Sequence, residues 1–385
     1  MRSSFKQVAL TLITAATCAC WMACGEGNPP HPCQGATCVP SAATFLYLTA
    51  LDDVSGFTIA SSGTPTSFQS HAGPNQSIGV VADPGAKFLF VSDFENASVH
   101  VFSIGHSSGL LTPVSSSPFP AGTPPDAGGI ALDPAAKFLY VTLPNSGKVS
   151  GLSINSSTGA LTQIAGLPIA AGSNPGQAIV APSGKFLYVS NLNDAQGSIS
   201  AYSIDPGKGG LTEISGSPFP TQANFPGPAG LAIGGIGKFL YVAMVGTANA
   251  NHVVSGFSID PTTGALTQLA TSPFPAGLGP IRLASDATGK FLFVANSHDD
   301  TLSVFAIDAG SGALTAVGSP YATHIAPVDV VVDPQGKFVF VVNSGSGDLS
   351  AFSLDSTTGV LKPLAGSPFA TGQQEPGGLA IIRTQ

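Results

Sequence analysis

Charged residues are scarce in this sequence. Only 9% of its 385 residues are Asp, Glu, Lys or Arg, and the formal net charge is −8; an ordinary soluble domain is about 25% charged. The few basic residues form no cluster. Because nucleic-acid binding rests on a basic patch, nucleic acid is not expected as a partner.

Long apolar runs and cysteine are missing from most of the chain. Beyond the N-terminus no uninterrupted apolar stretch reaches the roughly 18 residues that a membrane-spanning helix needs. All five Cys lie within the first 38 residues. Glycine and proline are abundant instead, with 47 and 32 copies, so the chain is expected to turn often.

The N-terminal segment has the pattern of an export signal. Residues 1–24 combine the basic Arg2 and Lys6 with an apolar stretch and then small residues. The segment from Trp21 to Cys24 resembles a bacterial lipobox, so we predict acylation of Cys24, with Cys20 as a second candidate and simple secretion as the alternative. The protein is thus expected in the cell envelope (periplasm, outer membrane or cell surface), touching the membrane only through its lipid.

Residues 25–40 are rich in proline and are predicted to be a tether. Within them, Cys33 and Cys38 are expected to form a small disulfide loop in an oxidising compartment. Together with His31 they provide too few ligands for a metal site, so the disulfide is preferred.

One phrase, Lys-Phe-Leu-(Phe/Tyr)-Val or a close variant, returns through the rest of the chain. Its leading Phe falls at positions 45, 88, 138, 186, 239, 291 and 338, a mean spacing of roughly 49 residues, which is typical of propeller blades. A strand and an Asp-Pro type turn precede the phrase. An alternating strand, a Thr-Gly or Ser-Gly hairpin and a fourth strand follow it.

The two ends of the repeat region complement each other. The first copy begins at the second strand of a unit, and residues 377–382 form a lone first strand. Joining them completes a unit, which leaves no open sheet edge. The sequence therefore predicts an all-β fold over residues 41–385: a seven-bladed β-propeller of four-stranded blades, closed by three N-terminal strands and one C-terminal strand.

The repeat also indicates a family. Mature residues contain no Trp, which argues against WD-type blades. The Gly-Leu-Ala-Ile and Asp-Pro-x-Gly-Lys-Phe-Leu-Tyr-Val pattern, with Asn191, Asn296 and Asn343 after it, resembles the lactonase family of seven-bladed propellers. That family includes 6-phosphogluconolactonases and carboxymuconate-cyclising enzymes, and it is similar to surface repeats named for a Tyr-Val-Thr-Asn (YVTN) core. The resemblance implies the fold and, as one option, lactone chemistry.

The start of each first strand is expected to line the axial channel, where propellers usually bind ligands. Aligning the repeats gives an outer column of residues and, three residues further on, an inner column. Glycine dominates the inner column. The predicted ligand-binding residues are the polar members of both columns: Gln76, Asp126, Asn174, Glu375, Gln177, Arg282 and Asp329.

Two of these are candidate catalytic residues. Arg282 is the only Arg between the export signal and Arg383, and a guanidinium can bind a carboxylate or phosphate, or polarise a carbonyl. Asp329 is its counterpart in the next repeat. The alternative is that Arg282 and Asp329 only form an ion pair across the channel.

The sequence departs from the family at this strand. Family members typically carry Arg-His directly after Gly-Pro, and often a Glu after the repeat Asn. Here Ile281 and Arg282 follow Gly279-Pro280, and Ser297 follows Asn296. Since neighbours on a strand point to opposite faces, a displacement by one residue would re-aim the Arg.

The first expectation is therefore a monomeric binding or scaffold propeller of the cell envelope with degenerate catalytic residues. Its partner would be a small molecule, a glycan or an envelope protein at the rim. The alternative is a lactone hydrolase of the 6-phosphogluconolactonase type, or a cycloisomerase, with Arg282 as electrophile and Asp329, Asp126 or Glu375 as general base.

Three further motifs receive a plain interpretation. Rim carboxylates could attract Ca²⁺, but scattered loop acids are usually solvated, so neither a metal site nor a cofactor is predicted. His298, beside Asp299, is interpreted as a surface residue. Residues 105–109 match G-x-S-x-G, but they fall in a predicted hairpin with no helix after it, so they are not a serine-hydrolase elbow.

Overall fold

The computed structural model describes residues 42–74, 76–193, 197–221, 227–246, 252–318 and 320–384. In these ranges there are 34 strands and no helix, so none that could span a membrane. The export signal, the tether, Cys24, Cys33 and Cys38 lie outside the described residues. The predicted all-β propeller is confirmed.

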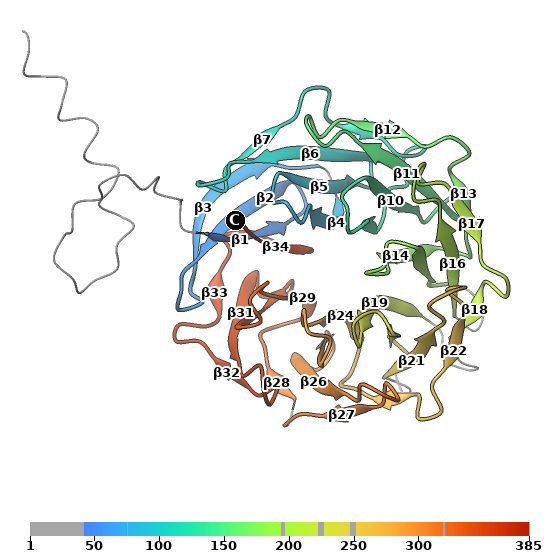
Figure 1. The fold of residues 1–385 in the computed structure, drawn as a ribbon. Helices are drawn as coiled ribbons and strands as arrows, with labels where there is room; N and C mark the ends of the chain where they lie inside the picture. Colours follow the sequence, from blue (N-terminus) through green and yellow to red (C-terminus); the bar gives the residue numbers. More distant parts are fainter. Residues whose placement is uncertain are drawn as a thin grey trace, which may run out of the picture.

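Seven antiparallel sheets stand around a central axis (Figure 1), and we call them blades 1 to 7. Blade 1 comprises β4 (Ser77–Ala82), β5 (Phe88–Asp93), β6 (Ser98–Ile104), β7 (Leu111–Pro113) and β8 (Phe119–Pro120). Blade 2 comprises β9 (Ile130–Leu132), β10 (Phe138–Leu143), β11 (Lys148–Ile154), β12 (Leu161–Gln163) and β13 (Ile169–Ala170). Blade 3 comprises β14 (Pro175–Val180), β15 (Phe186–Asn191), β16 (Ser198–Ile204), β17 (Leu211–Glu213) and β18 (Phe219–Pro220).

The remaining blades repeat this arrangement. Blade 4 comprises β19 (Pro228–Gly234), β20 (Phe239–Met244), β21 (Val253–Ile259), β22 (Leu266–Gln268) and β23 (Phe274–Pro275). Blade 5 comprises β24 (Pro280–Ser285), β25 (Phe291–Asn296), β26 (Thr301–Ile307), β27 (Leu314–Ala316) and β28 (Tyr321–Ala322). Blade 6 comprises β29 (Pro327–Val332), β30 (Phe338–Asn343), β31 (Asp348–Leu354), β32 (Leu361–Pro363) and β33 (Phe369–Ala370). Blade 7 comprises β1 (Thr44–Thr49), β2 (Asp53–Ile59), β3 (Pro65–Ala72) and β34 (Leu379–Arg383).

The outermost strand of blades 1 to 6 is divided in two. In blade 1, β7 pairs with the end of β6, and β8 pairs with its beginning. The Ser117-Pro118 segment lies between them, where proline lacks the N–H that a continuous ladder needs. The fourth strand predicted from the sequence is therefore a broken one.

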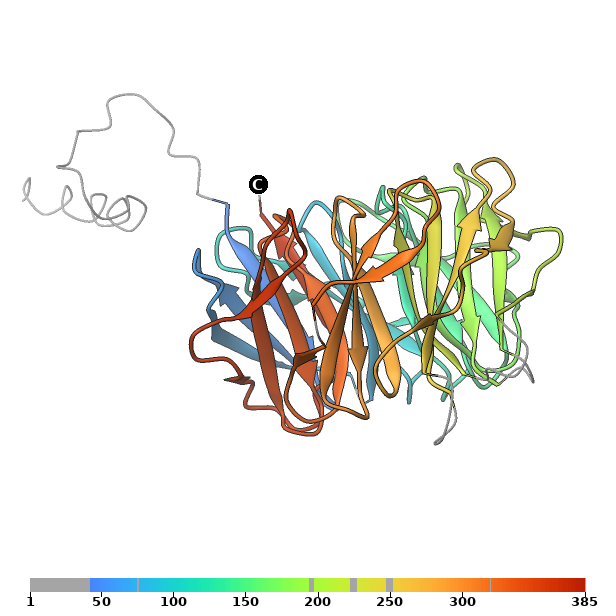
Figure 2. The same cartoon turned by 90° about the horizontal axis from the view of Figure 1, so that it is seen from below.

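The ring closes at blade 7, as predicted. The C-terminal β34 pairs antiparallel with β1, which pairs with β2. Beyond the ladder, Ala43 N donates to Thr384 Oγ1 at 3.0 Å and Thr384 N donates to Ala43 O at 2.9 Å. Figure 2 shows that the C-terminus lies at one face of the disc, the face where each innermost strand turns into the next strand.

The repeated Phe packs on a glycine of the next blade at every seam. A Cβ added to Gly109 would lie 2.5 Å from the Phe45 ring, and one added to Gly159 would lie 2.7 Å from the Phe88 ring. Both glycines have a positive φ, which favours glycine independently of the space. The same contact joins Phe138 to Gly209, Phe186 to Gly264, Phe239 to Gly312, Phe291 to Gly359 and Phe338 to Gly63.

Buried tyrosines add a hydrogen bond across some seams. Tyr188 Oη donates to Gly264 O at 2.8 Å, in the hairpin that the neighbouring Phe ring covers. Tyr47, Tyr140 and Tyr241 make the same bond in their own seams. The apolar core is likewise divided into seven clusters, each built from two adjacent blades.

Asp side chains hold four of the turns between first and second strands. Asp133 Oδ1 accepts the N–H groups of Lys137 and Phe138, each at 2.6 Å. Asp83, Asp286 and Asp333 do the same in blades 1, 5 and 6. These carboxylates are buried, so they hold the fold together and are not free to bind a ligand.

Candidate functional site

The strands that carry both predicted columns are the innermost ones (Figure 1), where β4, β14, β19, β24, β29 and β34 lie closest to the axis. This places the start of each first strand as the sequence predicted.

Most outer-column residues are turn residues. Gln76, Asn174 and Glu375 have φ values of 54°, 53° and 47°, in the left-handed region. Asn174 O accepts the N–H of Leu192, which follows the second strand, at 3.0 Å. These positions are therefore occupied for their backbone conformation, which Asn tolerates better than most residues. Of the three, Gln76 and Glu375 are exposed.

Asp126 is a structural residue. It is 2% exposed, and its Oδ1 accepts Asn145 N at 2.6 Å. Its Oδ2 accepts Ser146 Oγ at 2.5 Å and Ser146 N at 3.1 Å. With both oxygens engaged, the carboxylate fastens the β10–β11 turn to the segment before β9.

Gln177 in the inner column joins two blades. Its Oε1 accepts the N–H of Leu231 in blade 4 at 2.6 Å. Leu231 directly follows the inner-column residue of that blade, so the bond crosses the seam between first strands.

Asp329 makes the equivalent bond and one more. Its Oδ2 accepts the N–H of Leu379 in blade 7 at 2.8 Å, and its Oδ1 accepts the N–H of Val330 at 2.9 Å. Burial raises the pKa of Asp329, whereas the charge of Arg282 and these two N–H groups oppose that rise.

Arg282 differs from both. A guanidinium has no acceptor to offer the next blade, and the N–H that it would have met, that of Val330, is bound by Asp329 instead. Within the described parts of the chain the Arg282 side chain forms no hydrogen bond and no ion pair within 4.0 Å. The cation thus stands beside Asp329 with its donors unused, and the ion pair considered above is not formed.

Glycines of the inner column permit the close approach of adjacent first strands. A Cβ on Gly129 would lie 2.4 Å from Gly176 O, and one on Gly230 would lie 2.5 Å from Ile281 O and 2.9 Å from the Cα of Arg282. The backbone at Arg282 therefore lies so close to blade 4 that only a glycine fits at position 230.

Near Arg282 the side chains of β24 do not alternate regularly between the two faces of the sheet. Pro280 pairs with Asn296 and Arg282 with Ala295, so the register shifts between them. A bulge of this kind re-aims a side chain. The expectation that a one-residue displacement alone sets the direction of Arg282 therefore fails, because alternation cannot be counted through the bulge.

Two histidines lie against Gly279: His252, which the sequence analysis did not single out, and His298, which was predicted to be a surface residue and is exposed. The ring of His298 covers this glycine: an added Cβ would lie 2.6 Å from His298 Cγ. Gly279 N lies 3.1 Å from His252 Nδ1, which is also 2.8 Å from Val245 O, and the two ring centroids are 6.4 Å apart. The sequence feature that could have indicated this contact is Gly279, because a glycine leaves room beside it for an imidazole ring.

The loop that carries His298 is held in place by Gly279 and Leu278. Ser297 N and Oγ donate to Gly279 O at 2.8 and 3.1 Å, and His298 N donates to Leu278 O at 3.0 Å. Asp299 Oδ2 accepts Leu278 N at 2.9 Å. The backbone at His298 is thereby held beside Gly279, which precedes Arg282 by three residues in the chain.

The rim acids do not converge. In the described ranges no three His, Cys, Asp or Glu side chains gather in a metal-binding group. Asp299 and Asp348 are engaged by neighbouring donors, Asp348 by His324 Nδ1 at 2.5 Å and by Asn343 Nδ2 at 2.8 Å.

Comparison with known proteins agrees with this architecture. The family model described as lactonase, 7-bladed beta-propeller, matches residues 58–279 and 275–374. No protein of curated function matches the sequence.

Three solved structures illustrate the similarity. A protein from Lactobacillus plantarum is 23% identical, with a TM-score of 0.73 over 89% of this chain and 100% of that one. A putative 6-phosphogluconolactonase from Bacteroides uniformis is 18% identical, with a TM-score of 0.74 over 89% and 99%. The periplasmic gluconolactonase of Pseudomonas aeruginosa is 20% identical, with a TM-score of 0.71 over 89% and 99%. At these identities the likeness concerns the fold.

Proposed function

Since the chain belongs to the lactonase family of seven-bladed β-propellers, we propose that it hydrolyses a lactone at the axial start of blade 5. The observation that carries this proposal is the guanidinium of Arg282, which lies on an innermost strand and, among the described residues, forms no hydrogen bond and no ion pair within 4.0 Å. Its N–H donors are available for the carbonyl oxygen of a lactone, and they bind more strongly as that oxygen gains negative charge.

The reaction adds water to the carbonyl carbon and breaks the ring C–O bond. Arg282 stabilises the oxyanion, and His298 is the proposed general base: its imidazole takes a proton from the attacking water and returns it to the departing ring oxygen. The product is a hydroxycarboxylic acid, which loses its proton to solvent, and Arg282 then binds the resulting carboxylate.

The acids expected from the sequence are less suited to this role. Both oxygens of Asp126 and of Asp329 accept hydrogen bonds. A base must have a free oxygen that meets the water, so neither is proposed. Glu375, exposed at the closing blade, is the remaining carboxylate candidate.

Sugar lactones are the proposed substrate class. The support comes from family membership and from similar folds that carry the names 6-phosphogluconolactonase and gluconolactonase. We further propose export of the protein to the cell envelope with Cys24 acylated. This rests on the N-terminal pattern and on the periplasmic location in one neighbour's name.

The test is lactone hydrolysis by the purified protein on glucono-, 6-phosphoglucono- and muconolactone. Arg282→Ala is expected to lower kcat/KM by about 10²–10³-fold, as the loss of an oxyanion donor does. His298→Gln should lower kcat. Lys208→Ala removes an equal charge from an exposed hairpin and should leave kcat/KM unchanged. Full turnover by Arg282→Ala would disprove the assignment.

A second candidate function is binding without turnover, as a scaffold of the cell envelope. The observation in its favour is the engagement of Asp126 and Asp329, which leaves the axis poor in general bases. It predicts no hydrolysis of any lactone by the wild type, together with binding of an aldonate that Arg282→Ala abolishes. Because Arg282 is expected to bind gluconate under both proposals, turnover of the lactone panel by the wild type separates the two functions, and calorimetry with gluconate tests the binding that they share.

A further inference from the structure

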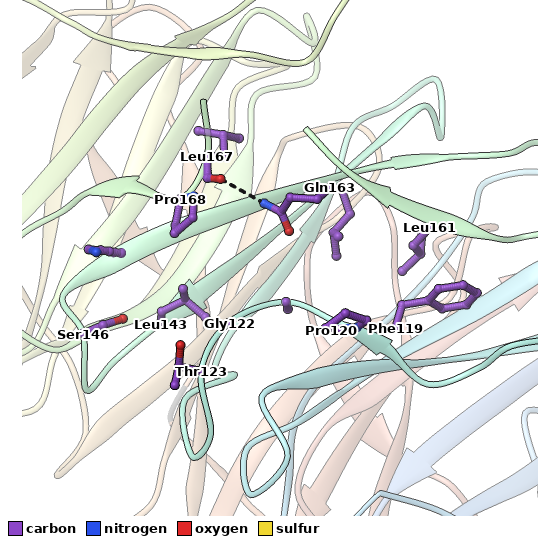
Figure 3. A pocket seen from close by; sticks show the side chains of 13 residues that line it. Phe119, Pro120, Gly122, Thr123, Leu143, Ser146, Leu161, Gln163, Leu167 and Pro168 are labelled. Carbon is purple, nitrogen blue, oxygen red and sulfur yellow. Dashed lines mark hydrogen bonds between the residues drawn. The ribbon is translucent and has the colours of Figure 1, made fainter. Parts of the chain in front are cut away.

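A pocket lies between blades 1 and 2, away from the axis. It has a volume of about 470 Å³, within the range of small-molecule sites. Figure 3 shows two rows of side chains facing each other, with Leu167, Gln163 and Leu161 in one row, and Leu143 and Phe119 in the other. These residues come from β8 of blade 1, from β10 and β12 of blade 2, and from the segment between β12 and β13.

The repeat provides an internal comparison for this pocket. Between blades 4 and 5, Pro275, Ala276 and Gly277 occupy the places of Pro120, Ala121 and Gly122, and the groove there has only about 170 Å³. Its lining includes Phe305, where the larger pocket has Leu152, and Val304, whose counterpart in blade 2 is Gly151, a glycine that the Leu167 side chain covers. Blade 2 has thus lost bulk at this groove.

A polar pair of blades 3, 5 and 6 is replaced here, and blade 4 also lacks it, with Met244 facing Val253. At the end of the second strand, Asn191 Nδ2 donates to Ser198 Oγ at 2.9 Å, and Asn296 Nδ2 donates to Thr301 Oγ1 at 3.0 Å. The positions that face each other in blade 2 are Leu143 and Lys148. An apolar side chain and a cation have together replaced a hydrogen-bonded pair.

A third difference from the repeat, at Leu167, lines the same pocket. Ser217 Oγ accepts the N–H of Ala201 in blade 3, and Ser117, Ser272 and Ser367 accept the matching N–H in their own blades. Blade 2 has Leu167 at this position, and its side chain lies on Gly151, where an added Cβ would be 2.3 Å away. Three departures from the repeat therefore line one pocket.

Lys148 is the charged group of the pocket. It is exposed, and within the described ranges its ammonium group has no ion pair. The rest of the lining is mostly apolar, and the Gln163 amide is held by Leu167 O at 3.3 Å and Ser150 Oγ at 3.2 Å. A cation beside an apolar wall matches a molecule with one negative charge on an apolar body.

We propose that this pocket binds a small amphiphilic carboxylate, an alkyl or aryl monoacid. The carboxylate pairs with Lys148, and the apolar body packs on Leu143, Leu161 and Leu167. The site is separate from the axis and stands independently of the lactone chemistry proposed above.

The test is calorimetric titration of the purified protein with decanoate, against 1-octanol as the neutral probe and octyltrimethylammonium as the cationic one. Decanoate should bind saturably and at least tenfold more tightly than either comparison probe. Lys148→Met should weaken decanoate binding at least tenfold, and Leu167→Ser, which restores the residue of the other blades, at least threefold. Lys185→Met, an exposed Lys elsewhere, should have no effect.

Each outcome decides the proposal. Lys148→Met and Leu167→Ser should both leave the ring folded, because Lys148 is exposed and serine occupies the position of Leu167 in other blades. A thermal scan of each variant verifies this. No saturable decanoate binding by the wild type would overturn the proposal, as would equal affinity in Lys148→Met or equal affinity for octanol. Loss of lactone hydrolysis in other variants has no bearing on it.

Discussion

Asp329 Oδ2 accepts the backbone N–H of Leu379 at 2.8 Å, and this bond joins blade 6 to the strand that closes the ring. Gln177 makes the matching bond to Leu231 between blades 3 and 4. Two residues that the sequence singled out as channel ligands therefore hold seams together. Arg282 is the inner-column side chain that this role does not explain.

The position of Asp329 gives it a pH signature. Because burial raises its pKa, its contribution to the free energy of unfolding is complete below the pKa of the unfolded chain, about 3.9. It decreases as the pH rises through the raised folded value. We expect the stability of the wild type relative to Asp329→Asn, measured by urea unfolding, to fall as the pH rises above about 4. A difference that grows with pH would contradict this.

Inner-column glycines should resist even alanine. Gly129→Ala places a Cβ 2.4 Å from Gly176 O, and overpacking of this kind costs about 1–3 kcal/mol. Gly210→Ala is the matched control, because nothing lies within 4 Å of its added Cβ, and its effect should stay within about 0.5 kcal/mol. Chemical denaturation of both variants checks the difference, and equal stabilities would disprove the close-approach argument.

Blade 3 offers a stabilising substitution. Ala181 stands where four other blades have the turn-capping Asp, and Ala181 N already donates to Phe186 O as Asp133 N does to Phe138 O. Ala181→Asp should add two N–H acceptances and about 1 kcal/mol, whereas Asp133→Ala should lose about 2 kcal/mol. Urea midpoints measure both, and destabilisation by Ala181→Asp would mean that its turn cannot adopt the capped geometry.

Tyr202 links blade 3 to blade 2 through a 2.6 Å bond from Oη to Ala170 O. Tyr202→Phe should cost about 1 kcal/mol at neutral pH. Burial raises the pKa of Tyr202 to about 12, so the contribution of the phenol is complete below about pH 10 and is lost as the pH rises toward 12. Unfolding measured from pH 8 to 11 should show a smaller pH dependence in the variant than in the wild type.

The fold could be predicted because its determinants are local and repeated. Phe88 and Gly159 each belong to a set of seven equivalent residues, one in every blade, at nearly constant spacing. The packing of such a Phe on such a glycine forms every seam. The site could be predicted only in part. The repeat alignment located Arg282, but the bulge at Pro280 and the acceptor role of Asp329 depend on how neighbouring strands meet.

The meeting of His252 and His298 illustrates the same limit. They come from loops of two different blades, 46 positions apart in the chain, and both contact Gly279. Neither loop carries a motif. Their proximity results from the seam geometry, which a single sequence does not state.

The bonds between Ala43 and Thr384 also mean that the ring has no preferred starting point. All seven seams contain the same Phe–Gly contact, and the first and last strands of the ring, β1 and β34, meet inside blade 7 and not at a seam. A short linker from Thr384 to Ala43 would turn the chain into a closed circle. New ends could then be opened in another hairpin, and the position of the termini could be moved around the disc without changing the axis that holds Arg282.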